Sequence, residues 1–138
     1  MRRLLLPTLL ALAALAAGCG SASSSSTDFE GQEKAVADQV EKIQSAGEAR
    51  NAKELCDQVL AASLRDAIAN AGSSCEVELD KAIRDADDFN LDVEDVTITG
   101  DTAVAKVKTG SGDDAPTRDF EFEKEGNSWR ATSLGTTS

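Results

Sequence analysis

The stretch VEDVTITGDTAVAKVK (residues 93–108) contains two segments rich in β-branched residues, which are joined by the turn-forming sequence TGDT. Apolar and polar residues largely alternate on both sides of the turn, which is typical of strands with one buried face. Val93 and Val96 are three residues apart, so in a regular strand their side chains would point to opposite faces of the sheet. We therefore expect a bulge or a bend near Glu94 and Asp95. This stretch therefore predicts an antiparallel hairpin.

Two further strands are expected downstream of this hairpin. Phe120 and Phe122 alternate with glutamates, the sequence EGN at residues 125–127 marks a tight turn, and residues 129–134 form the last strand. A longer loop is expected at residues 110–116, where glycines and a proline gather. Four strands joined by turns predict an antiparallel meander.

The residues before the hairpin have helical periodicity. Val36, Val40 and Ile43 form an apolar stripe at helical spacing on an otherwise charged segment. Residues 51–54 (NAKE) and 73–76 (SSCE) each resemble a capping box, so each is expected to open a helix.

The first capping box is expected to open a helix that carries apolar residues as far as Leu60. Leu64 and Ile68 continue the stripe up to the stop signal NAG at residues 70–72. Helices first and strands afterwards predict an α+β domain, with helices on one face of a four-stranded antiparallel sheet. We assign residues 28–138 to this single domain.

The N-terminus has the features of a bacterial lipoprotein signal. Arg2 and Arg3 precede a 14-residue apolar block that is too short to span a bilayer, so residues 1–18 read as a signal peptide. The sequence AAGC at residues 16–19 resembles a lipobox, in which Cys19 is acylated with chains such as palmitate and becomes the first mature residue. Residues 19–27 would then be a lipidated cysteine with a flexible Gly/Ser tether. The alternative is a secreted protein in which Cys19 is a free thiol.

The two other cysteines can form a disulfide. Export places the domain in a compartment where disulfides persist. Lipidation of Cys19 leaves two cysteines, Cys56 and Cys75, which can pair with each other. A bridge across these 19 positions would contribute about 3 kcal/mol by loop closure. Two reduced cysteines in the core are the alternative. The predicted location is the extracytoplasmic face of the cell membrane.

The composition narrows the chemistry of the chain. It has no His and no Tyr, which excludes a Ser-His-Asp or Cys-His arrangement and an imidazole metal site. Removal of Arg2 and Arg3 with the signal peptide leaves 12 of the 14 basic residues against 25 acidic ones, a net charge of −13. Without a basic stripe, no nucleic-acid partner is expected. The acidic run from Asp85 fails the EF-hand pattern, and we expect no metal and no cofactor.

Three segments together resemble a known fold family: CDQVLAASL (residues 56–64), the hairpin at 93–108 and FEFEKEGNSWRATSL (residues 120–134). They are similar to the nuclear-transport-factor-2-like fold, a cone of helices packed into a curved sheet. In particular, the chain resembles small actinobacterial lipoproteins that carry this domain behind a lipobox. The resemblance covers residues 28–134. It implies a fold that also hosts ketosteroid isomerase and polyketide cyclases, which use acidic or histidine bases and often a tyrosine.

The apolar residues of the predicted strands have two interpretations. They could line a hydrophobic pocket in the mouth of the cone, or they could fill the core, which needs them because the chain has few aromatic residues. The candidate pocket residues are Ile98, Val107, Phe120, Phe122 and Trp129.

The predicted function is a lipid-anchored, non-catalytic binding or interaction module. One alternative is a carrier of an apolar small molecule or lipid in the cone. The other is an isomerase-like or cyclase-like enzyme with a buried carboxylate base, although the tyrosine and histidine partners are absent. The membrane, reached through the N-terminal lipid, is the expected partner. An envelope protein, an apolar ligand and a homodimer through the exposed sheet face, which the fold resemblance implies, are further candidates.

Overall fold

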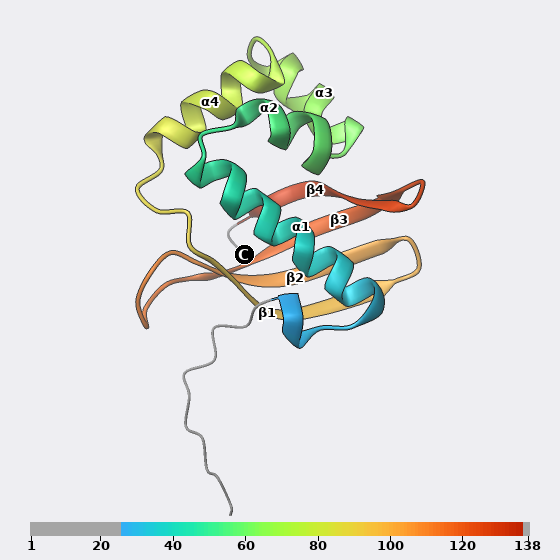
Figure 1. Cartoon of the computed structure of the whole chain (residues 1–138). Coiled ribbons are helices and arrows are strands. Elements are labelled where there is room, and N and C mark those ends of the chain that lie inside the picture. The colour runs from blue at the N-terminus through green and yellow to red at the C-terminus, as the bar shows by residue number, and fades with distance from the viewer. Residues whose placement is uncertain (1–25, 137–138) are drawn as a thin grey trace, which may run out of the picture.

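The computed structural model of the chain describes residues 26–136 (Figure 1). The predicted signal peptide, Cys19 and residues 20–25 lie outside this range, as do the last two residues. Helical segments fill the first part of the described chain: η1 (Ser26–Asp28), α1 (Gly31–Glu48), α2 (Ala52–Glu54), η2 (Leu55–Val59), α3 (Ala62–Ala71) and α4 (Cys75–Asp85). Strands fill the second: β1 (Leu91–Thr99), β2 (Thr102–Thr109), β3 (Thr117–Glu125) and β4 (Ser128–Thr136). The predicted α+β class is confirmed.

The sheet is the predicted meander. Its four strands are antiparallel and follow the order β1-β2-β3-β4. Gly100 and Gly126 occupy the turns of two hairpins with φ of 60° and 63°, a conformation that glycine adopts without steric cost. The expected bulge is also confirmed, because the register of β1 against β2 shifts between Val93 and Asp95.

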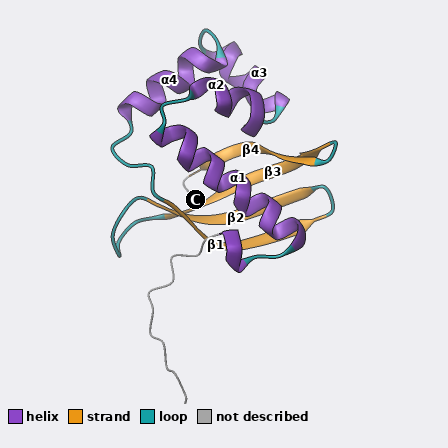
Figure 2. Ribbon diagram, viewed as in Figure 1, coloured by secondary structure: helices purple, strands orange, loops and turns teal. Residues whose placement is uncertain are grey.

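The core lies between α1 and one face of the sheet. Figure 2 shows α1 crossing that face, while α2, α3 and α4 group beyond β4. Val36 and Val40 of α1 are fully buried in one cluster with the inward side chains of the sheet, which confirms the apolar stripe predicted for this helix. The opposite face of the sheet is polar, and Thr97, Lys106 and Glu121 are exposed on it.

The described structure begins before the predicted domain boundary. Ser26 and Thr27, which we assigned to the tether, belong to η1. Ser26 is only 4% exposed, and its backbone N–H donates to Glu41 Oε1 at 2.8 Å. The chain is therefore attached to the domain two residues earlier than the sequence predicts.

The helix predicted through Leu60 is broken, so that prediction is wrong. Residues 55–59 form a π-helical turn, and Leu60 is extended, with φ −77° and ψ 141°. Leu60 makes a parallel bridge with Ala131 of β4, and the Ala61 N–H donates to the Ala131 carbonyl at 2.8 Å. These bonds to β4 replace those that a continuous helix would make.

One capping prediction is confirmed and the other needs correction. Asn51 Oδ1 accepts from the Glu54 N–H at 3.1 Å, as an N-cap does. The later helix is capped by Ser74 rather than Ser73, because Ser74 Oγ accepts from the Val77 N–H at 3.3 Å. The capping box predicted from Ser73 therefore begins one residue too early.

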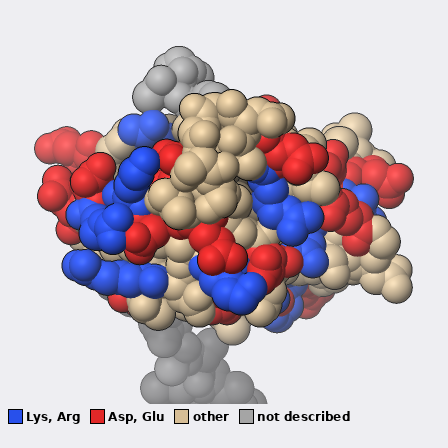
Figure 3. All heavy atoms as spheres, turned by 90° about the horizontal axis from the view of Figure 1, so that it is seen from above, with Lys and Arg blue, Asp and Glu red and all other residues tan. Residues whose placement is uncertain are grey.

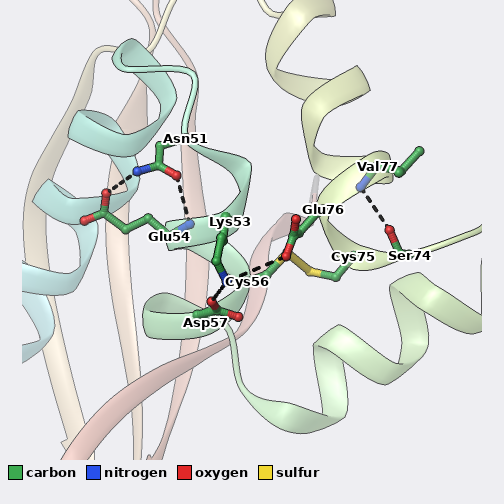
Figure 4. Close-up of a disulfide and its surroundings, with 9 residues drawn as sticks. All are labelled: Asn51, Lys53, Glu54, Cys56, Asp57, Ser74, Cys75, Glu76 and Val77. Atoms are coloured by element: carbon green, nitrogen blue, oxygen red, sulfur yellow. Dashed lines mark hydrogen bonds and ion pairs between the residues drawn. A yellow bond between two sulfur atoms is a disulfide. The ribbon is translucent and has the colours of Figure 1, made fainter.

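The predicted disulfide between Cys56 and Cys75 is present (Figure 4). It joins η2 to the first turn of α4, with the two Cα atoms 6.1 Å apart. Lys53 lies beside it and pairs with Asp57 and, at 3.9 Å, with Glu76 (Figure 4). The bridge therefore fastens the α3–α4 hairpin to the helical turn that packs on β4.

Gly47 of α1 allows Phe89 to pack closely against the helix. A Cβ atom built on Gly47 would overlap the Phe89 ring. We expect Gly47→Ala to lower the free energy of unfolding by about 1–3 kcal/mol through overpacking, although alanine has the better helix propensity by about 1 kcal/mol. Urea unfolding measures the change. The double variant with Phe89→Leu should recover part of the loss, and a more stable Gly47→Ala protein would contradict the packing described.

Candidate functional site

The five candidate pocket residues lie in the core. Val107, Phe120, Phe122 and Trp129 are at most 4% exposed, and Ile98 packs against the same cluster. None of them lines either of the two hollows described below. Their arrangement agrees with the interpretation that they fill the core.

The larger hollow is a cleft of about 650 Å³ beside α1. Its walls come from segments far apart in the sequence, which the fold brings together at one end of the sheet. They are Glu41, Gln44 and Ser45 of α1, residues 90–93 at the start of β1, Lys108 of β2 and residues 110–112 of the β2–β3 loop.

Most residues of the cleft wall are uncharged. Val93 and Val107 are buried and paired with each other, so strand alternation directs the side chains of Asp92 and Lys108 to the other face of the sheet. We therefore expect those two residues to contribute to the wall mainly through their backbone. The remaining polar side chains of the wall are two amides (Gln44 and Asn90), two hydroxyls (Ser45 and Ser111) and one carboxylate (Glu41).

Hydrogen bonds fix the walls of the cleft to one another. Gln44 Oε1 accepts from the Leu91 N–H at 3.1 Å, which ties α1 to the start of β1. The Gly110 N–H donates to the Asn90 carbonyl at 2.8 Å, which ties the β2–β3 loop to the same place. The cleft is thus preformed, and its geometry does not depend on a ligand to assemble it.

Asp88 holds the two loops at the end of the cleft together. Its carboxylate accepts from the Ser111 hydroxyl at 2.6 Å and from the Asn90 N–H at 2.7 Å. The Asn90 side-chain amide in turn donates to Ser111 Oγ at 2.6 Å. The pKa of Asp88 is lowered below its ordinary value because both bonds favour the charged carboxylate. The Ser111 hydroxyl has the larger effect, and the Asn90 N–H has the next largest.

This network predicts a pH dependence of the loop contact. Because the pKa of Asp88 is lowered in the folded state, its stabilising contribution is present above the unfolded value of 3.8 and is lost as the pH falls through the folded pKa. We expect Ser111→Ala to raise the Asp88 titration midpoint toward 3.8, measured by NMR of the side-chain carboxyl carbon. Ser128→Ala, at an exposed residue of β4, is the control and should leave the midpoint in place. An unchanged midpoint in Ser111→Ala would show that the hydroxyl does not bond Asp88 in solution.

The acidic side chains of the described residues lie outside the fully buried core. Over residues 26–135, Ser26 is the only polar or charged residue that is fully buried. Every carboxylate in that range keeps some exposure. In the same part of the chain, no group of three or more His, Cys, Asp or Glu residues could hold a metal ion.

Two other surface features are a second hollow and the ion pairs of α4. A smaller, more open hollow of about 360 Å³ lies near the disulfide, between residues 50–53 and the first turns of α4. Exposed ion pairs such as Arg84–Asp80 (2.5 Å) and Lys81–Glu78 (3.1 Å) cover α4. Figure 3 shows basic and acidic side chains interspersed on the face seen from above. Exposed pairs of this kind contribute at most about 1 kcal/mol each and form no single-sign patch on that face.

The cleft was missed by sequence reasoning, because its walls are largely backbone and short polar side chains. One local signal was available: Asp88 and Asn90 stand two positions apart, the spacing of an Asx turn, in which a side chain accepts from the backbone two residues on. That signal marks a structured loop. It does not reveal that Ser111, which is 21 positions beyond Asn90, completes the network.

Within residues 26–136, no helix has the length and apolar character required to cross a bilayer. Comparison of the chain with protein families, with curated proteins and with solved structures gave no significant match.

Proposed function

We propose that this chain is a lipid-anchored binding protein of the extracytoplasmic face of the cell membrane, which holds a small, uncharged, hydrogen-bonding ligand in the cleft beside α1. The observation that carries the proposal is the cleft itself. Its volume of about 650 Å³ lies within the 300–1,000 Å³ typical of small-molecule sites, and its uncharged polar side chains are amides and hydroxyls. Such groups donate and accept at once, which suits hydroxyl- or amide-bearing molecules.

The anchor is supported by the N-terminal sequence and by the disulfide. Residues 1–18 and the sequence AAGC fit a lipoprotein signal, and two or three acyl chains on Cys19 would give durable attachment. The bridge between Cys56 and Cys75 independently suits an oxidising, extracytoplasmic compartment.

We also propose that the domain is of the nuclear-transport-factor-2-like type. Support comes from the order of the elements and from the helices that cover one face of a four-stranded antiparallel sheet. The proposed binding role differs from an apolar carrier in one respect. Phe120, Phe122 and Trp129, which a carrier would need around a cavity, supply the buried core instead.

Substitution of Cys19 tests the anchor. Cys19→Ala removes the thiol that would carry the lipid, so we expect acylation and membrane retention to be lost. Detergent phase partitioning and intact-mass measurement of the envelope fraction report both properties. Complete retention of Cys19→Ala in the membrane fraction would contradict the anchor.

Native mass spectrometry tests the binding role. The acylated protein, extracted from its own envelope in mild detergent, should carry a stoichiometric extra mass that is lost on denaturation. Ser45→Trp, which places an indole at the cleft wall, should remove that mass, whereas Ala82→Trp at an exposed residue of α4 should keep it. No extra mass in the parent protein would overturn the proposal, and retention of the mass in Ser45→Trp would place the ligand elsewhere.

A further inference from the structure

The chain enters the domain at the edge of the cleft. Ser26 is buried, and its N–H donates to Glu41 Oε1 at 2.8 Å. Phe29 packs against the core, and its N–H donates to the Ser26 carbonyl at 3.4 Å. Glu41 is at the same time part of the cleft wall. One side chain therefore joins the entry point of the chain to the candidate binding site.

The entry point and the α3–α4 hairpin lie at opposite ends of the domain. Figure 1 shows η1 beside β1, at one edge of the sheet, and α3 and α4 beyond β4, at the other edge. The sheet order β1-β2-β3-β4 separates these two ends by the full width of the sheet. A membrane reached through the N-terminus therefore lies on the η1 side.

The tether is too short to reverse this arrangement. Cys19 and Ser26 are seven residues apart, and seven extended residues span at most about 25 Å. A domain of about 110 residues has a radius of gyration of about 13 Å and is roughly 35 Å across. A path from Ser26 around half of that circumference would be about 50 Å long, so the tether cannot bring the α3–α4 end to the bilayer by wrapping around the domain.

We infer that the cleft faces the bilayer to which the chain is anchored and that its ligand is the uncharged, hydroxyl-bearing headgroup of a membrane lipid. This inference rests on the proposed function. Anchoring keeps the cleft within reach of the headgroup layer, where a lipid ligand has a high effective concentration. The mature net charge of −13 and the carboxylate of Glu41 disfavour anionic headgroups, whereas the Ser45 hydroxyl can bond hydroxyls.

The orientation is tested with the acylated full chain in phosphatidylcholine vesicles that contain an acceptor fluorophore on a trace lipid headgroup. A donor is attached at Lys42→Cys, next to Glu41, or at Asn70→Cys near the end of α3. Both positions are exposed, while Cys56 and Cys75 are bridged. We expect several-fold greater energy transfer from position 42 than from position 70. Equal transfer, or greater transfer from position 70, would overturn the orientation.

The ligand class is tested by adding digalactosyldiacylglycerol to the same vesicles and ejecting the protein for native mass spectrometry. The parent protein should retain one glycolipid, and Ser45→Trp should retain none. In solution, Cys19→Ala is offered the headgroup alone, galactosylglycerol without acyl chains, and should bind it many-fold more weakly. Equal binding of the free headgroup would place the ligand source in solution and overturn the lipid assignment.

The outcomes separate this inference from the proposed function. If the parent protein retains no glycolipid, yet a different stoichiometric ligand is lost with Ser45→Trp from envelope-extracted protein, the inference is wrong and the proposed function stands. If neither preparation yields a ligand, both are wrong.

Discussion

Replacing Phe122 by alanine is expected to lower the free energy of unfolding by about 3–5 kcal/mol. Phe122 is 1% exposed and lies at the centre of the sheet, where it pairs with Ala103 on β2 and Ala131 on β4. Because both cross-strand neighbours are alanines, the Phe122 ring fills the volume that they leave, and neither neighbour is large enough to fill the space without it. The substitution therefore removes the apolar contact and leaves a cavity.

Urea unfolding followed by circular dichroism measures this loss. Glu121→Ala is the matched control, because Glu121 is the exposed neighbour on the other face of the same strand and should change stability by less than about 0.5 kcal/mol. A loss below about 1 kcal/mol for Phe122→Ala would mean that the core does not close around this ring.

The double variant Cys56→Ala/Cys75→Ala is expected to lose about 3 kcal/mol of stability, the value that loop closure gives for a bridge between residues 19 positions apart. The effect should concentrate in the α3–α4 hairpin. No residue of α3 is fully buried, and Ile83 is the only one in α4. The hairpin therefore depends on the bridge for its attachment more than the rest of the domain does.

Hydrogen exchange and thermal unfolding test this prediction together. In the double variant, amide protection should fall most in α3 and α4, while the sheet keeps its slow exchange. A reducing agent should lower the melting temperature of the parent protein to that of the double variant and should leave the double variant unchanged. If the double variant has the same melting temperature as the parent protein, the disulfide does not stabilise the domain.

The strands were predictable from the sequence because their signals are local. The change of parity between Val93 and Val96 is visible in four consecutive residues, and it marked the bulge correctly. The TGDT and EGN turns likewise place glycines where the hairpins need a positive φ, so the number and order of the strands followed from short stretches.

The helix break at Leu60 was not predictable in the same way. The apolar stripe runs through Leu60 without a glycine or a proline, so periodicity alone favours a continuous helix. The competing bonds come from Ala131, 71 positions later in the chain, and no local pattern reports them. The cleft was not predicted for a related reason. Gln44, Asn90 and Ser111 become neighbours only when the start of β1 and the β2–β3 loop pack beside α1.

The bridge between Leu60 and Ala131 has a consequence for how the protein behaves when many copies crowd one surface. A strand at the border of a sheet offers unpaired amide and carbonyl groups to any other chain, which makes it a nucleus for aggregation. The Ala61 N–H occupies the Ala131 carbonyl, so the chain covers part of the free border of β4 with its own backbone. Where copies of the chain are crowded together, that border is thereby protected against strand pairing with a neighbouring copy.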